Sequence, residues 1–169
     1  MKDEALRQKR LVFYQEDQVR IDRMLNDFLS LSKGRCALLI DKDGHLVTRQ
    51  GATGSWDLDT ISALVAGSFA ATKEMARLLG EEEFTVLFHQ GAKDSIQLAL
   101  VGERTLLAVI FDDKTTVGMV RLYSGELAKK LGGLFHEILS RKPGEGPQQK
   151  IDQRFGEAAA GKLDDLFGK

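Results

Sequence analysis

Hydrophobic and polar positions divide the chain into helix-like and strand-like segments. Apolar residues recur three or four positions apart over residues 14–32 and 57–80, and again in a third segment that begins after Thr115 or Thr116 and includes Ile138. Strand-like segments lie at residues 36–40, 45–49, 84–90, 95–101 and 105–111, separated by glycines and turn residues. The pattern predicts the element order αββαβββα.

Two of the strands are apolar at nearly every position, which indicates where they lie in the sheet. The run from Leu106 to Phe111 has no polar face, and residues 36–40 are similar. Such strands must be covered on both sides, so the sheet is a layer between helices. We therefore predict an α/β layered fold. Its five-stranded antiparallel sheet has the order 2-1-5-4-3, between the second helix on one face and the first and third helices on the other.

The predicted order leaves the strand at residues 84–90 at an edge of the sheet. Its neighbour at 95–101 has the alternation of a half-buried strand, with Leu98 and Leu100 on one side and Gln97 on the other. A bare apolar edge invites aggregation, so another chain is expected to pair with it, and a second copy is the simplest candidate. The edge residues expected in this dimer interface are Phe84, Val86, Phe88 and His89.

The second helix provides a further reason to expect a dimer. At 100° per residue its core side is predicted to hold Leu58, Ile61, Val65, Phe69, Thr72, Ala76 and Leu79, with Leu64, Met75 and Leu78 beside them. The other side is small and uncharged in its first half, which permits close approach of a partner. The predicted partner or dimer interface is Ala63, Ala66, Gly67, Ala70, Lys73, Glu74 and Arg77. Alternatively, the alanines are only good helix formers, although Gly67 argues against this because glycine weakens a helix interior.

Composition and charge exclude several classes of function. The 169 residues suit one domain with appendages, and the formal net charge is -1. A nucleic-acid-binding protein would show a basic surface, so no nucleic acid is expected as a partner. No apolar run approaches the roughly 18 residues that span a bilayer, so we expect a cytoplasmic protein without membrane insertion. The single cysteine, Cys36, allows no intramolecular disulfide and is expected to be buried and inert.

No catalytic pattern survives inspection. Residues 156–162 match the spacing of a phosphate-binding loop, but Leu163 follows where Ser or Thr is needed. Residues 41–44 hint at a calcium loop, yet Ala52 stands at the twelfth position, where Glu is expected. The three histidines show no metal-ligand spacing. We therefore expect no catalytic residue, no metal site and no cofactor in this chain.

Several segments taken together resemble a known family. They are residues 83–84, 88–95, 109–113 and 117–122, with 64–67, 70–71 and the closing 163–167. In combination they are similar to bacterial MglB proteins of the Roadblock-type dynein light chain superfamily, over nearly the whole chain from Val12. The resemblance implies the fold derived above. It also implies a homodimer in which the second helices pair and the edge strands join two sheets.

The resemblance implies a function as well. MglB-like proteins bind a Ras-like small GTPase of the MglA type and stimulate its GTP hydrolysis, in control of cell polarity or gliding motility. The resemblance implies that no residue of this chain acts as an arginine finger. Arg77 lies on the helix face that the family uses, so it is the arginine most worth testing. Equally, Arg77 is explained as a solvated arginine near the C-terminal end of the helix. Such a protein would be cytoplasmic and concentrated at a cell pole. The alternative is a non-stimulating Roadblock-type scaffold for dimerisation and localisation.

The predicted domain organisation has three parts. Residues 11–140 form the Roadblock-type domain, residues 141–150 form a flexible linker, and residues 151–169 form an amphipathic tail. A helix as short as this tail is only marginally stable in water by itself. The tail is therefore expected to become ordered when it docks on a partner. Its expected contacts with the GTPase are Phe155, Leu163, Leu166 and Phe167. Stabilising the dimer, or docking on its own domain, is the alternative.

Overall fold

The computed structural model describes residues 13–141, so the predicted tail and almost all of the predicted linker lie outside the described residues. The elements follow the predicted order. They are α2 (Gln15–Ser32), β1 (Cys36–Asp41), β2 (Leu46–Gly51), α3 (Leu58–Leu78), β3 (Val86–His89), β4 (Ser95–Val101), β5 (Thr105–Phe111) and α4 (Val117–Ser140).

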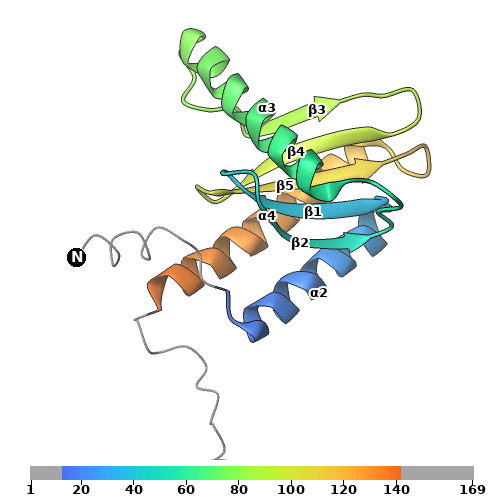
Figure 1. Cartoon of the computed structure of the whole chain (residues 1–169), viewed down its shortest axis with the longest axis vertical. Helices are drawn as coiled ribbons and strands as arrows, with labels where there is room; N and C mark the ends of the chain where they lie inside the picture. Colours follow the sequence, from blue (N-terminus) through green and yellow to red (C-terminus); the bar gives the residue numbers. More distant parts are fainter. Residues whose placement is uncertain (1–12, 142–169) are drawn as a thin grey trace, which may run out of the picture. The chain divides into compact units, whose positions relative to one another are not determined.

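The strands form one antiparallel sheet in the order β2-β1-β5-β4-β3, as predicted (Figure 1). The two apolar strands β1 and β5 pair at its centre, with Cys36 opposite Ile110 and Asp41 opposite Thr105. β3 pairs with β4 from Val86 opposite Ala99 to His89 opposite Ile96. Burial on both faces therefore places the strands that have no polar side in the middle of the sheet.

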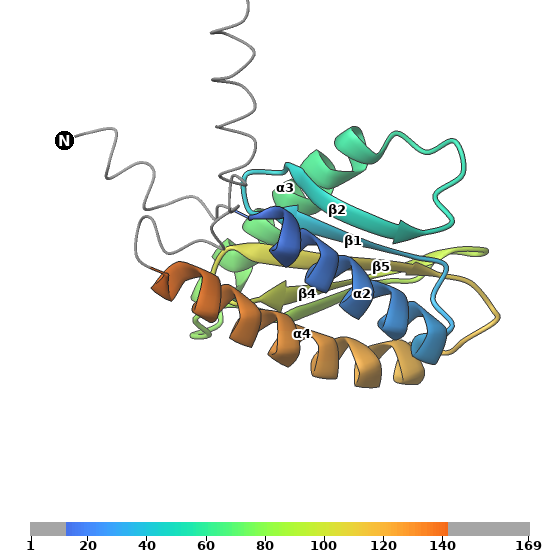
Figure 2. The same cartoon turned by 90° about the horizontal axis from the view of Figure 1, so that it is seen from below.

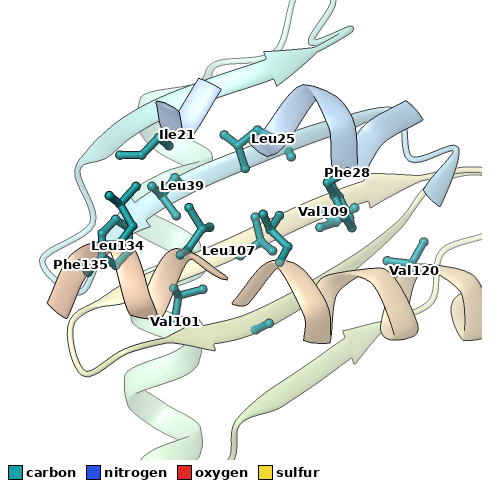
Figure 3. Packing of buried hydrophobic residues seen from close by; sticks show 14 of the residues in the cluster. Ile21, Leu25, Phe28, Leu39, Val101, Leu107, Val109, Val120, Leu134 and Phe135 are labelled. Atoms are coloured by element: carbon teal, nitrogen blue, oxygen red, sulfur yellow. The ribbon is translucent and has the colours of Figure 1, made fainter. Parts of the chain in front are cut away.

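Helices cover both faces of the sheet. Figure 2 shows α2 and α4 together on one face and α3 on the other. Apolar side chains from α2, α4 and the strands point into the first of the two resulting cores, among them Leu25, Leu107 and Leu134 (Figure 3). The second core lies under α3 and contains Val65 and Phe69 with strand residues such as Leu106.

The ends of α3 are fixed by local hydrogen bonds and a glycine. The Asp57 carboxylate accepts hydrogen bonds from the Thr60 hydroxyl at 2.6 Å and from the Thr60 amide at 3.1 Å. These bonds favour the ionised carboxyl and hold the pKa of Asp57 below its usual value. Gly80 follows the helix with φ of 81°, the left-handed conformation that glycine adopts readily.

Two strand predictions were wrong. The edge strand begins at Val86, so Phe84 lies before it in the connection from α3. Gln97 is 1% exposed, although the alternation in β4 suggested a polar side. The reason is that β4 lies between the two helix layers, and both of its faces are covered at this point. Within residues 13–141 the Gln97 carboxamide has no hydrogen-bond partner.

Candidate protein interaction site

The outward side of α3 is apolar. The side chains of Leu64, Met75 and Leu78 are 66%, 52% and 77% exposed. With Gly67 and Ala71, which are also exposed, they follow one another at spacings of three and four residues and so form one stripe along the helix. We call Leu64, Gly67, Ala71, Met75 and Leu78 the α3 stripe. Large apolar side chains gathered on one exposed face are typical of a surface that another protein covers.

The α3 stripe corrects the predicted arrangement of the helix. Leu64, Met75, Leu78 and Leu79 were expected in or beside the core and are exposed instead. Ala66 was expected on the interface side, yet it is 7% exposed and packs in the core beneath α3. The helix has two apolar faces, and the sheet takes the one with Val65, Ala66 and Phe69. The other predicted interface residues, Ala63, Gly67, Ala70, Lys73, Glu74 and Arg77, are exposed as expected.

Glycine at position 67 leaves the α3 stripe open at its centre. A Cβ atom built on Gly67 would meet no atom within 4 Å. Nothing in the chain's own packing therefore requires glycine there, although glycine costs about 1 kcal/mol relative to alanine inside a helix. A close approach by another chain would explain it.

The charged residues near the C-terminal end of α3 form ion pairs on the surface. Arg77 Nε lies 3.0 Å from Glu74 Oε2, and both side chains are largely exposed. Glu83 Oε1 lies 3.3 Å from Lys42 Nζ and 4.0 Å from Lys73 Nζ. Exposed pairs of this kind contribute at most about 1 kcal/mol each. Their net effect is to border the α3 stripe with charge.

β3 leaves one edge of the sheet open beside α3. It pairs with β4 on one side and is the last strand of the sheet on the other. Val86 and Phe88 are 41% and 36% exposed, while Leu87, on the opposite face, packs in the core beneath α3. Figure 1 shows the C-terminal end of α3 extending past this strand. The open edge therefore lies beside α3, and its exposed side chains Val86 and Phe88 are on the face of the sheet away from that helix.

Phe88 is held in place by an aromatic contact across β4. Its ring stacks on that of Phe111, with centroids 6.0 Å apart and an angle of 19° between the planes. Such pairs add about 0.5–1.5 kcal/mol beyond burial of their area. His89, the last residue of the strand, is exposed on the face of Leu87. The predicted edge residues Val86, Phe88 and His89 thus lie together, whereas Phe84 does not belong to the strand.

A cluster of three residues that the sequence did not reveal connects this edge to the start of α3. The Arg35 guanidinium lies 4.7 Å above the centre of the Trp56 ring, and its Nη1 is 3.0 Å from Asp94 Oδ1. Trp56 precedes α3, and Asp94 belongs to the turn between β3 and β4. Arg35 therefore fixes the relative position of the two elements that form the candidate surface. The three residues come from distant segments, so no local pattern indicates them.

No group of His, Cys, Asp and Glu within residues 13–141 could hold a metal ion. Cys36 is buried as predicted, and this burial raises the pKa of its thiol to about 11, against a partial lowering by the nearby Arg35 charge. Among residues 13–141, no helix combines the length and the apolar character that a membrane span requires. The surface of α3 and β3 is suited to binding another protein.

Comparison with known proteins identifies the family of the chain. Residues 20–111 match the sequence profile of the Roadblock/LC7 domain. MglB from Myxococcus xanthus is 36% identical, with 70% of this chain and 96% of that one covered and a TM-score of 0.67. The gliding protein MglB from Thermus thermophilus is 34% identical over 75% of this chain and 96% of its own, with a TM-score of 0.72. An MglB structure with a tetrameric arrangement is also 34% identical, covering 76% and 96%, with a TM-score of 0.72.

Fold and sequence together define the class: the chain belongs to the Roadblock/LC7 family. Within the family it is MglB-like, because it is 36% and 34% identical to two MglB proteins over 96% of the length of each. The resemblance inferred from the sequence is thereby confirmed.

Proposed function

We propose that the protein is a homodimeric regulator that binds a Ras-like small GTPase of the MglA type and stimulates its GTP hydrolysis. The observation that carries the proposal is the α3 stripe beside the open edge of β3. The similarity of this chain to MglB supports the choice of partner. The name of the Thermus relative, a gliding protein, supports a role in polarity or motility.

Dimerisation follows from the physical requirements of both surfaces. Two β3 strands that pair edge to edge satisfy each other's free backbone groups and extend the sheet across the dimer. Two α3 helices packed side by side bury Leu64, Met75 and Leu78, each contributing about 1.5–3 kcal/mol when fully covered. Gly67 lets the helix backbones approach closely. The joined pair then presents a composite surface that neither copy has alone.

The proposed stimulation needs no arginine from this chain. An inserted arginine typically contributes about 10³–10⁵ in rate. Arg77, the arginine on the predicted face, is paired with Glu74 on its own helix. The dimer would instead bind the GTPase in a conformation that positions the GTPase's own catalytic groups. On this mechanism Arg77→Ala retains most of the stimulation, whereas an arginine finger would lose it by orders of magnitude.

Two measurements test the proposal. The first is the mass of the protein in solution at micromolar concentration, by light scattering or sedimentation, for the natural chain and for Met75→Asp. A dimer that Met75→Asp converts to monomer is expected. The second is phosphate release by an MglA-type GTPase with and without the protein. A rise in turnover is expected with the natural chain and not with Met75→Asp.

The second candidate function is a scaffold that dimerises and localises partners without stimulating them. The same surface favours it, because an apolar stripe and an open edge account for assembly by themselves. Phosphate release separates the two candidates. A scaffold binds the GTPase and leaves its turnover unchanged, and a monomer at high concentration would contradict both.

We also propose that residues 151–169 contact the GTPase outside this surface, through Phe155, Leu163, Leu166 and Phe167. Residues 141–150 act as the linker, which spans about 15–18 Å on average and so gives the segment reach. Deleting residues 151–169 is expected to weaken GTPase binding while the dimer persists. If the deletion leaves the affinity for the GTPase unchanged, this role is contradicted. Docking of residues 151–169 on their own domain, or stabilisation of the dimer, would then be the remaining roles.

A further inference from the structure

A cavity of about 610 Å³ opens at the end of the sheet where two strand turns meet. The end of β1 contributes Asp41, and the turn that follows it contributes Asp43 and His45. The turn between β4 and β5 contributes Glu103 and Arg104. Phe13 lines the cavity from the start of the described chain. No residue of the α3 stripe lines the cavity, although its wall residue Lys42 pairs with Glu83 at the border of that stripe.

Carboxylates predominate among the charged groups of this cavity. Asp41 accepts a hydrogen bond from the His45 amide at 2.8 Å, and its second oxygen lies 3.3 Å from His45 Nδ1. Within residues 13–141, the carboxylates of Asp43 and Glu103 form no hydrogen bond or ion pair. The cations on the walls are Arg104 and Lys42, and the ammonium of Lys42 lies 3.3 Å from Glu83. Two carboxylates therefore remain for a basic ligand.

The sequence carries basic residues shortly before Phe13, which lines this cavity. Arg7, Lys9 and Arg10 precede Phe13, with no acidic residue among them or between them and Phe13. The Phe13 ring packs edge-on against Phe135, with centroids 5.7 Å apart, and so anchors the chain at the wall. Each residue spans at most about 3.6 Å, so Arg10 must lie within about 11 Å of Phe13. This short tether keeps the segment at roughly millimolar effective concentration around the cavity.

We propose that this cavity is the docking site of the chain's own N-terminal basic segment, residues 7–12. Arg7, Lys9 and Arg10 pair with the carboxylates of Asp43 and Glu103, and Leu11 and Val12 lie against Leu46 and Val47 of the cavity wall. Charge complementarity and the anchor at Phe13 favour this occupant over a separate molecule, because a tethered segment loses less freedom on binding.

Docking would also brace a turn that supports α3. Gly44, between the cavity residues Asp43 and His45, packs against the helix so closely that a Cβ added to it would lie 3.0 Å from Ala63 Cα. A segment seated on one side of the turn would therefore restrict a loop whose other side contacts α3. This consequence depends on docking alone, not on the identity of the α3 partner.

Cleavage by trypsin after Arg7, Lys9 and Arg10 measures docking in the full chain, because a docked segment is cut only when it dissociates. The test variant is Asp43→Asn with Glu103→Gln, which removes the cavity charges and adds no tryptic site. The matched control is Asp113→Asn with Glu126→Gln, which loses the same charge from exposed residues outside the cavity. Intact mass reports each cut, and Trp56 fluorescence confirms that both variants are folded.

We expect the cavity variant to be cut about tenfold faster than the natural chain, the size that a few exposed charge pairs produce together. The control variant should be cut at the natural rate. In the natural chain, raising NaCl to about 0.5 M should remove the protection, because salt screens exposed charges. A free peptide of residues 1–13 corrects for the effect of salt on trypsin. Equal cleavage of the natural chain and the cavity variant would overturn the proposal, as would protection that salt does not change.

Discussion

Leu64 and Ala66 lie on opposite sides of α3, two positions apart in the sequence. The Leu64 side chain is 66% exposed, whereas Ala66 is 7% exposed and packs against the sheet. The larger apolar residue is therefore outside and the smaller one inside. This reverses what the hydrophobic effect selects for a helix that covers one core only. The arrangement is understandable if α3 serves two apolar surfaces, its own sheet and a second protein.

The pair gives a direct test of which face binds the partner. Leu64→Arg places a charge in the α3 stripe, so we expect a folded monomer with an unfolding free energy within about 1 kcal/mol of the natural monomer. Ala66→Arg forces a long charged side chain into the core and should cost more than about 4 kcal/mol or prevent folding. Urea unfolding and solution mass distinguish the two results. A stable dimer of Leu64→Arg would exclude the α3 stripe as the contact.

The sequence was sufficient to predict the strand order but not which face of α3 packs on the sheet. The strand order followed from Leu106 to Phe111 and residues 36–40, because a strand without a polar face has only one place in a layered fold. The inner face of α3 could not be assigned in the same way. Apolar residues occupy two sides of that helix, and periodicity does not distinguish a side chain buried by its own sheet from one covered by a partner.

Two other features lay beyond sequence reasoning for different reasons. Gln97 is buried because α4 covers β4, and alternation along one strand carries no information about where a later helix crosses. The cluster of Arg35, Trp56 and Asp94 depends on contacts between residues far apart in the chain. Within the candidate site, the exposed edge was predictable and its strand limits were not, since Phe84 has strand character and lies outside β3.

The contact between Gly44 and Ala63 predicts a position-specific loss of stability. Gly44 has φ of 93°, and an added Cβ would lie 3.0 Å from Ala63 Cα, so Gly44→Ala combines backbone strain with overpacking. We expect a loss of about 3 kcal/mol. Gly54→Ala is the matched control, because Gly54 also has positive φ but open space around it, and should lose about 1–2 kcal/mol. Equal losses in thermal or urea unfolding would show that α3 does not press on the turn.

The contacts of Arg35 predict a larger effect than its partly exposed position suggests. Arg35→Ala removes both the stacking on Trp56 and the pair with Asp94, and we expect a loss of about 1–2 kcal/mol. Trp56 emission should shift as its ring gains solvent. Arg35→Lys retains the charge without the planar group and should recover less than half of the loss. Arg23→Ala, an exposed arginine of α2, controls for charge and should change stability by less than about 0.5 kcal/mol. If Arg35→Ala leaves the stability and the Trp56 emission unchanged, the cluster does not hold the hairpin of β3 and β4 in place.

Burial of Cys36 predicts a loss of stability at alkaline pH. The pKa of its thiol rises from 9.0 to about 11 in the folded chain, so between these values the folded state binds more protons than the unfolded state. The contribution of this group is fully present below about pH 9. It decreases by up to about 1.4 kcal/mol per pH unit until pH 11, because unfolding then releases the proton.

Urea unfolding at several pH values measures the slope. Cys36→Ala controls for lysines and tyrosines that titrate in the same range, so the difference between the two slopes belongs to Cys36. If the natural chain and Cys36→Ala give the same slope of unfolding free energy against pH, the thiolate forms as easily in the folded core as in the unfolded chain. Iodoacetamide would then label the native protein at pH 8.5. We expect this reaction only after unfolding.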